Sequence, residues 1–328
     1  MLTLPRFEWA QPTTLAETLA LLAAHGRDAL VVAGGTDAVP NLKHRLHEPR
    51  VVVHLGRVRE LDFARDEADG LHLGPLTTLS RLAAHEAVRR DFPSLARAAG
   101  LVAGPQLRNM GTLGGNLCLD TRCTYYNQTH FWRESLGFCL KKDGVHCHVV
   151  PQGKRCVAAH SSDVAPVLIS LDAEVEIAGA AGRRTVSVEN FFVPDGIHNN
   201  QLAPGELVSR VFVPAKSRGL RAGYQKLRPR AAIDFPMLSV AFAARVNGVC
   251  ERARLVVSAL AATPRVIGGL DKLVVGRPLD EAAAEAMAQA AYKQCRPQIS
   301  VAYDADYRHE MVPVFVRRAV REAMGAGS

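Results

Sequence analysis

The spacing of apolar and polar residues along the first part of the chain predicts alternating helices and strands. A capping box at 14–17 opens an amphipathic helix that we expect to end at Gly26. Short apolar runs at 30–33 and 51–55 are typical of buried strands, and the run at 71–74 leads into a further helix. This part of the chain therefore has an α/β pattern.

Beyond about residue 221 the pattern changes, because strand-like runs come first and helical runs follow. The strand-like runs are 223–227, 237–246 and 252–260. The helical runs, rich in alanine and other helix formers, are 281–295 and 307–324. Strands followed by helices predict a separate α+β domain, and we expect its boundary within PAKSRG, residues 214–219.

Composition narrows the class of protein. The chain has 328 residues, 48% of them apolar and 22% charged, which is enough for about two globular domains. The formal charge of +8 is dispersed, with no aromatic-interleaved basic stripe of the kind that binds nucleic acid. The first residues lack a basic region followed by an apolar stretch, and no apolar run approaches the ~20 residues that span a bilayer. We therefore expect a soluble, cytoplasmic protein with no nucleic acid or membrane partner.

Two glycine-rich turns are the first candidates for chemistry. LVVAGGTD, residues 30–37, ends a predicted strand in two glycines, and RNMGTLGGN, residues 108–116, repeats the arrangement. Glycine permits positive φ and lets backbone N–H groups approach an anion closely, while Thr36, Thr112 and Asn116 add side-chain donors. Neither turn has the spacing of a dinucleotide-binding fingerprint or a P-loop. Either alone is typical of a tight turn, but the pair favours a site for one cofactor diphosphate.

Five of the seven cysteines lie between Cys118 and Cys156, and this clustering indicates metal ligation. The last four have the spacing C-x15-C-x7-C-x8-C, which is neither a compact ferredoxin motif nor a zinc knuckle. Spacing alone leaves two alternatives open. One is a [4Fe-4S] cluster, its anionic sulfurs stabilised by backbone donors and by cations at Arg122, Lys141, Lys142 and Arg155. The other is a tetrahedral zinc site, with His130, His146 and His148 as further candidate ligands.

Four motifs in a fixed order resemble a known family. They are VVAGGTD, LGPLTTLSRLAAH, RNMGTLGGN and SSDVAPVLISLDAEVEI, and their series resembles the flavin-binding subunits of molybdenum hydroxylases, the xanthine dehydrogenase and carbon monoxide dehydrogenase group. The resemblance implies an α+β protein with a two-part FAD-binding region, residues 1–57 and 58–216. A smaller α+β C-terminal domain, residues 217–328, would follow, with a three-stranded sheet plus helices.

The same resemblance implies a set of FAD-binding residues. Those expected to hold the diphosphate and ribose are Val31, Val32, Ala33, Gly34, Gly35, Thr36, Asp37, Thr112, Gly114, Gly115 and Asn116. Val102 and Ala103 would lie close to the flavin, Asp163 would bind the far end of the cofactor, and Lys226 would sit near the ring. A positive charge there would stabilise an anionic reduced flavin. From the residues alone, Asp163 is equally well placed to cap a helix, and Lys226 to be a solvated strand residue.

An insertion at about 119–158, which most members of the family lack, contains CLDTRCTYYNQ followed by further cysteines. It resembles the flavin (beta) subunits of 4-hydroxybenzoyl-CoA reductases, and this likeness implies a [4Fe-4S] cluster on Cys123, Cys139, Cys147 and Cys156. Cys118 directly follows GGNL and is expected to be a small buried residue. Cys250 and Cys295 are expected to be structural.

The resemblance also implies a function in electron transfer. Removing a phenolic hydroxyl reductively needs a low-potential donor, so electrons would pass from a ferredoxin-like protein through the cluster and FAD to a small [2Fe-2S] subunit and a large molybdopterin-binding subunit. The expected assembly is (αβγ)2. No catalytic residue is expected in this chain, because no nucleophile and base are paired in the sequence.

Two alternatives belong to other classes of protein. In one, the chain is the flavin subunit of an NAD-linked molybdenum hydroxylase acting on an N-heterocycle or aldehyde, and the insertion is a structural metal site. In the other, it is a flavoprotein that works without partners.

Overall fold

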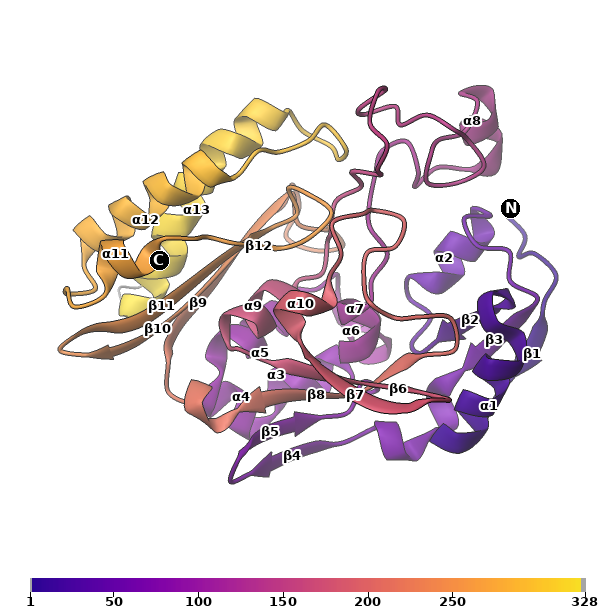
Figure 1. The fold of residues 1–328 in the computed structure, drawn as a ribbon, viewed down its shortest axis with the longest axis horizontal. Coiled ribbons are helices and arrows are strands. Elements are labelled where there is room, and N and C mark those ends of the chain that lie inside the picture. The colour runs from indigo at the N-terminus through magenta and orange to yellow at the C-terminus, as the bar shows by residue number, and fades with distance from the viewer. Residues whose placement is uncertain (1, 326–328) are drawn as a thin grey trace.

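The computed structural model describes residues 2–325, and in this range the chain folds around three β-sheets (Figure 1). The first is parallel, with order β1-β3-β2, and consists of β1 (Glu8–Ala10), β2 (Ala29–Val32) and β3 (Val51–His54). Its helices are α1 (Leu15–His25) and α2 (Ala38–Lys43). Thr14 caps α1 by accepting a hydrogen bond from the Glu17 N–H, and Gly26 follows the helix with φ 50°. The predicted bounds of this helix are confirmed.

The second sheet is antiparallel and has the order β4-β5-β8-β6-β7. Its strands are β4 (Ala64–Glu67), β5 (Gly70–Leu73), β6 (Glu174–Gly179), β7 (Gly182–Ser187) and β8 (Leu207–Pro214). The helices of this part are α3 (Leu79–Ala84), α4 (Glu86–Asp91), α5 (Pro93–Gly100), α6 (Pro105–Met110), α7 (Leu113–Leu117), α9 (Val164–Ser170) and α10 (Val188–Phe191). The sequence pattern did not predict β7, because this edge strand is largely exposed and polar and so has no buried face to mark it.

The third sheet is antiparallel, with order β12-β11-β10-β9. It consists of β9 (Arg221–Leu227), β10 (Leu238–Asn247), β11 (Val249–Ser258) and β12 (Arg265–Val266). The expectation of three strands was therefore wrong by one, because β12 has two residues, too few to show alternation. The helices that follow are α11 (Leu270–Val274), α12 (Glu281–Gln294) and α13 (Ala305–Met324). No helix among the described residues, α13 included, is long and apolar enough to cross a membrane.

The third sheet is covered on both faces. Helix α13 packs on β9 and β10, and α12 packs on α13, with Phe242 and Val316 in their shared core. Helices α5 and α9 of the second part contact the sheet as well, and Tyr224 and Ala241 belong to the core on that side. Strand β10 is therefore buried from Leu238 through Ala244, which explains its unbroken apolar run.

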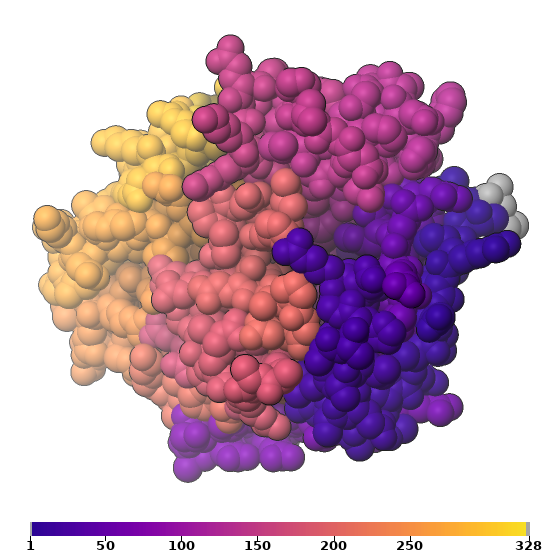
Figure 2. All heavy atoms as spheres, turned by 45° about the vertical axis from the view of Figure 1, so that its right-hand side comes forward, coloured from indigo at the N-terminus to yellow at the C-terminus, as the bar shows by residue number. Residues whose placement is uncertain are grey.

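Residues 119–158 form a lobe of loops with the short helix α8 (His130–Ser135), seen in magenta at the top of Figure 1. Figure 2 shows this lobe lying across both the N-terminal and the C-terminal parts of the chain. Buried Arg133 donates to the carbonyls of His44 and Arg45 at 3.1 and 3.0 Å. The Thr124 N–H donates to the Ser300 carbonyl at 2.7 Å. The insertion is thus anchored at both ends of the scaffold.

Candidate cofactor and cysteine sites

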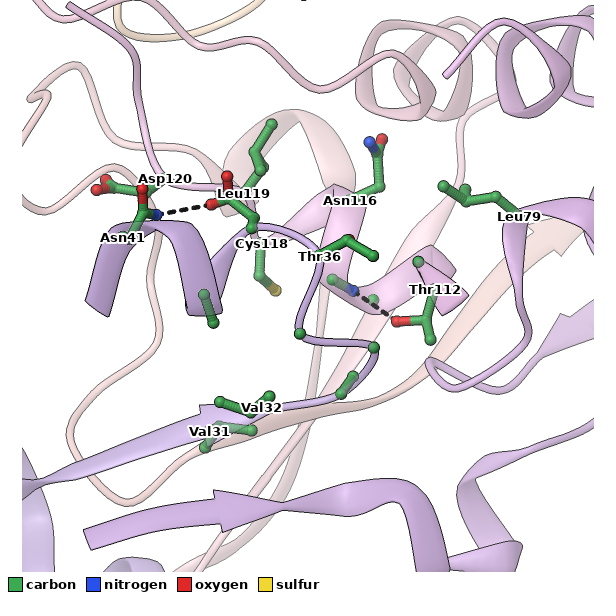
Figure 3. Close-up of a pocket in the computed structure, with 18 of the residues that line it drawn as sticks. Val31, Val32, Thr36, Asn41, Leu79, Thr112, Asn116, Cys118, Leu119 and Asp120 are labelled. Atoms are coloured by element: carbon green, nitrogen blue, oxygen red, sulfur yellow. Dashed lines mark hydrogen bonds between the residues drawn. The ribbon is translucent and has the colours of Figure 1, made fainter. Parts of the chain in front are cut away.

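A cavity of about 490 Å³ lies between the parallel sheet and the five-stranded sheet. This volume is in the range of small-molecule and cofactor sites. Every predicted cofactor residue except Lys226 lines it, namely Val31, Val32, Ala33, Gly34, Gly35, Thr36, Asp37, Val102, Ala103, Thr112, Gly114, Gly115, Asn116 and Asp163. Figure 3 shows Thr36, Thr112 and Asn116 around the same space, although they come from segments far apart in the sequence. The fold thus joins the two glycine-rich turns into one site.

The first glycine turn presents unused backbone donors to this cavity. The N–H groups of residues 34–37 make no hydrogen bond within the described part of the chain. Gly35 has φ 70°, which a side chain would strain, and a Cβ on Gly34 would stand 1.9 Å from the Met110 carbonyl oxygen. Both glycines are therefore required by geometry, one for the turn itself and one for direct packing against the segment that leads into the second turn.

The second glycine turn was also expected to supply backbone donors, but its N–H groups are already in use. The N–H groups of Gly114, Gly115 and Asn116 already bond to Pro75 and Thr112. Its side chains face the cavity instead. The Asn116 Oδ1 accepts from the Ser162 hydroxyl at 2.9 Å and from the Val164 N–H at 3.2 Å, which orients the amide and leaves Nδ2 as a donor.

Asp163 and Lys226 form one buried pair. Lys226 Nζ lies 2.9 Å from Asp163 Oδ1 and also donates to the Leu101 carbonyl at 3.2 Å, while the Tyr224 hydroxyl donates to Asp163 at 2.6 Å. Burial raises the pKa of the Asp163 carboxyl and lowers the pKa of Lys226, and each partner opposes the shift of the other.

Both simpler interpretations of these two residues are wrong. Asp163 makes no capping hydrogen bond to α9, and the Lys226 side chain is only 1% exposed. The pair instead puts a fixed, buried cation directly behind the cavity wall at Asp163.

A second cavity is lined by the four predicted metal ligands, Cys123, Cys139, Cys147 and Cys156, all of them buried. The Val150 N–H donates to the Cys147 sulfur at 3.4 Å and the Ala158 N–H to the Cys156 sulfur at 3.5 Å, so backbone donors face this cavity. Burial raises the pKa of the Cys123 thiol to about 11. No three of the four sulfurs, all within the described range, lie within 4.8 Å of one another.

The remaining cysteines lie elsewhere. Cys118 is half-buried and lines the larger cavity, where burial raises the pKa of its thiol to about 12. Cys250 and Cys295 belong to the core between the third sheet and its helices. The structure therefore separates four cysteines from the other three by position, as the sequence motif did.

The two cavities share a polar wall that the sequence did not reveal. Lys141 lines the cysteine cavity, and its Nζ donates to Asp120 at 2.7 Å and to the Thr121 hydroxyl at 2.5 Å. The same ammonium lies 4.3 Å from the ring centroid of Tyr126. Asp120 lines the larger cavity. A buried ion pair thus joins the two sites.

Of the cations expected to surround the cysteines, Arg122 and Arg155 are placed differently. The Arg122 side chain lines the larger cavity and forms an ion pair with Asp37, and Arg155 is exposed to solvent. Residue spacing could not reveal this, because neighbouring side chains in an extended segment point in opposite directions.

A cavity with unused backbone donors and a buried cation behind its wall fits an anionic cofactor. The chain belongs to the FAD-binding subunits of the molybdenum hydroxylase family. Residues 5–216 match the FAD binding domain in molybdopterin dehydrogenase, and residues 223–323 match the CO dehydrogenase flavoprotein C-terminal domain. The predicted family and α+β fold class are confirmed.

Individual relatives match most or nearly all of the chain. The carbon monoxide dehydrogenase medium chain of Hydrogenophaga pseudoflava is 29% identical over 97% of both chains. The aldehyde oxidoreductase FAD-binding subunit of Escherichia coli (strain K12) is 34% identical over 74% of this chain and 78% of its own. A solved structure of carbon monoxide dehydrogenase from Hydrogenophaga pseudoflava superposes with a TM-score of 0.80 at 26% identity, covering 99% of this chain and 100% of the other.

The residues of the large cavity fit FAD. The N–H groups of residues 34–37 suit a diphosphate, and the amide of Asn116 suits a polar group of the cofactor. The apolar side of the cavity near Val102 and Ala103 suits a flat ring. Lys226 lies just behind Asp163, where its charge would favour electron-rich flavin.

Proposed function

We propose that the chain is the electron-transfer flavin subunit of a molybdenum enzyme of the 4-hydroxybenzoyl-CoA reductase type. It would connect an external donor such as a ferredoxin with a small [2Fe-2S] subunit and a large molybdopterin-binding subunit, in an (αβγ)2 assembly. Cys123, Cys139, Cys147 and Cys156 would hold a [4Fe-4S] cluster. The observation that carries this proposal is the convergence of these four cysteines on one buried cavity next to the cofactor cavity.

The donors around the four sulfurs support a cluster, and the sulfurs as placed do not form a closed zinc site. A tetrahedral zinc ion with bonds of about 2.3 Å brings its sulfur ligands to roughly 3.8 Å from one another. No three of these sulfurs are within 4.8 Å of one another, so as placed they do not form a closed tetrahedral zinc site. Backbone N–H groups aimed at Cys147 and Cys156 suit anionic sulfur, and Lys141 adds a buried positive charge.

Residues of this chain would hold FAD and the proposed cluster and would set the charge around them. Residues 31–37 and Asn116 would bind FAD, which supplies a carrier able to exchange electrons with one-electron centres. The Asp163–Lys226 pair keeps a cation fixed behind the cavity wall. The Asp120–Lys141 pair stands between the two cavities, with the Lys141 side chain only 5% exposed.

Metal and flavin analysis of the anaerobically purified chain tests the proposal. We expect about four irons, matching acid-labile sulfide, one FAD and a reduced-cluster EPR spectrum after dithionite treatment. Stoichiometric zinc without iron would contradict the cluster and with it the reductase assignment. The same preparation should accept electrons from a reduced ferredoxin much faster than from NADH.

A second candidate is the flavin subunit of an NAD-linked molybdenum hydroxylase acting on an N-heterocycle or aldehyde, with the insertion a structural zinc site. The relative named for aldehyde oxidation supports it, because that chain is 34% identical to this one. Rapid reduction of the bound flavin by NADH, together with one zinc per chain, would favour this candidate.

A further inference from the structure

The charged side chains that line the cofactor cavity are mostly carboxylates. Five carboxylates line it: Asp37, Asp120, Asp163, Glu206 and Asp234. Each forms an ion pair, and the partners in the same order are Arg122, Lys141, Lys226, Arg184 and Arg230. Four of these cations stand outside the wall. Among the described residues that line the cavity, Arg122 is the only Lys or Arg. A cofactor with two phosphates therefore meets one permanent positive side chain.

Arg122 is held in a fixed position. Its backbone pairs with Ala159 through hydrogen bonds of 2.8 and 2.7 Å, which join the two ends of the insertion. Its guanidinium lies 4.3 Å from the ring centroid of Phe235 and forms an ion pair with Asp37, the residue at the end of the first glycine turn. Its Nε is buried and has no hydrogen-bond partner in the described chain.

We propose that Arg122 binds the diphosphate of FAD, so that the insertion supplies a cofactor ligand in addition to its cysteines. A guanidinium carries five N–H donors in a planar fork, so it can keep its bond to Asp37 while others reach a phosphate oxygen. The unused N–H groups of residues 34–37 lie on the same turn as Asp37. Arginine and amides then hold the anion together, and stacking on Phe235 fixes the guanidinium plane.

This inference goes beyond the proposed function, because it holds whether the cysteines carry iron or zinc. It also gives the insertion a role in flavin binding. Arg122 directly precedes Cys123, so one extended segment places a guanidinium in the larger cavity and a thiol in the smaller one.

Equilibrium binding to the deflavinated 328-residue chain, followed by flavin fluorescence, tests the proposal with two probes. FAD carries the diphosphate, and riboflavin lacks it. We expect Arg122→Gln to raise the Kd for FAD by about tenfold or more, the scale of one lost charge-assisted contact, and to change the Kd for riboflavin less than about twofold. Arg122→Lys keeps the charge without the fork and should fall between the two. Arg155→Gln, an exposed arginine of the same insertion, is the matched control and should behave as wild type.

Two results would overturn the proposal. One is a Kd for FAD that Arg122→Gln leaves within twofold of wild type. The other is equal weakening of FAD and riboflavin, which would make Arg122 a support of the cavity and not a diphosphate ligand. Riboflavin binding by the variant also shows that the cavity is still folded, so a misfolded protein is not mistaken for a lost contact.

Discussion

The two cavities of this chain are built in opposite ways. The large cavity is lined by several segments spread between residues 30 and 235. Its hydrogen-bond donors are largely backbone groups that packing between elements holds in place. The small cavity is lined by residues 123–158 alone, and its candidate ligands are side chains. Folding alone fixes the positions of backbone donors. The positions of side chains on one loop would also depend on the group that they bind.

The protonation of the thiols distinguishes the small cavity from the large one. Burial raises the pKa values of Cys123 and Cys156, so both thiols are protonated at neutral pH. Under the proposed function a metal would bind thiolates, so its binding would displace these protons and supply free energy that keeps the sulfurs together. The cofactor cavity has no such requirement, because amide donors titrate at no accessible pH. The following predictions test this contrast, from the largest expected effect to the smallest.

Removing one cysteine ligand should empty the small cavity and spare the large one. We expect Cys139→Ser to lower iron from about four per chain to well below one, because a cluster lacking one thiolate is labile. FAD should still bind, since residues 31–37 are untouched. Cys250→Ser is the control, because Cys250 lies in the C-terminal core, where its sulfur contacts the Arg252 carbonyl. Equal iron in the two variants would exclude Cys139 as a ligand.

Adding one methyl group should damage the large cavity and spare the small one. In Gly34→Ala the new Cβ would stand 1.9 Å from the Met110 carbonyl oxygen, so one of the two glycine turns must move. We expect the Kd for FAD to rise at least about tenfold, measured by fluorescence, with the iron content unchanged. Gly100→Ala is the control, because its Cβ would meet nothing closer than 3.9 Å. Unchanged affinity in Gly34→Ala would mean that the turn is not part of the FAD site.

Lys141 tests whether the shared wall tunes the cluster. Reduction adds negative charge, which a buried ammonium stabilises, so Lys141→Gln should lower the cluster's midpoint potential. We expect about a tenfold change in the reduction equilibrium, or about 59 mV for one electron, in a redox titration followed by EPR. Lys154→Gln, at an exposed position of the insertion, should leave the potential unchanged. Equal potentials in the Lys141 variant and wild type would remove Lys141 from this role.

His160 lies in the sequence between the insertion and Asp163 and is fully buried. Burial lowers the pKa of His160 to about 3, so the folded chain keeps it neutral where the unfolded chain, with a pKa near 6.5, takes up a proton. Its contribution is therefore complete above about pH 6.5 and is lost as the pH falls toward 3.

Chemical denaturation at two pH values measures this effect. Between pH 7 and pH 5 the free energy of unfolding should fall by about 1 to 2 kcal/mol more in wild type than in His160→Asn. His198→Asn changes an exposed histidine and should follow wild type. Parallel losses in all three proteins would show that His160 titrates normally.

Local features of the fold could be predicted because they depend on neighbours in sequence. Thr14 and Gly26 mark the ends of α1 by capping, and the glycines of residues 30–37 predict a tight turn after a strand. The edge strand β7 and the two-residue β12 could not be predicted, since one lacks an apolar face and the other is too short to show a period. Both exist because a neighbouring strand offers hydrogen bonds.

The partners of buried charges were beyond prediction for a related reason. Asp163 and Lys226 lie 63 positions apart and Asp37 and Arg122 lie 85 apart, so no spacing rule links them. The residues alone left it open whether Asp163 caps a helix or binds the cofactor, and they placed Arg122 near sulfur. Burial without a partner is costly for either charge, so each was paired only when folding brought an opposite charge within reach.

The sequence by itself determined the kind of chemistry here: the glycine turns, the four cysteines in one insertion and the ordered motifs that indicated a flavin subunit. Each of these features depends on residues that are close together along the chain. Only the tertiary structure decided that the two turns share one cavity, that the four thiols meet in another, and that Arg122 leaves the cysteines to face Asp37. Those outcomes depend on contacts between distant segments, whose geometry is set by how the three sheets and their helices pack.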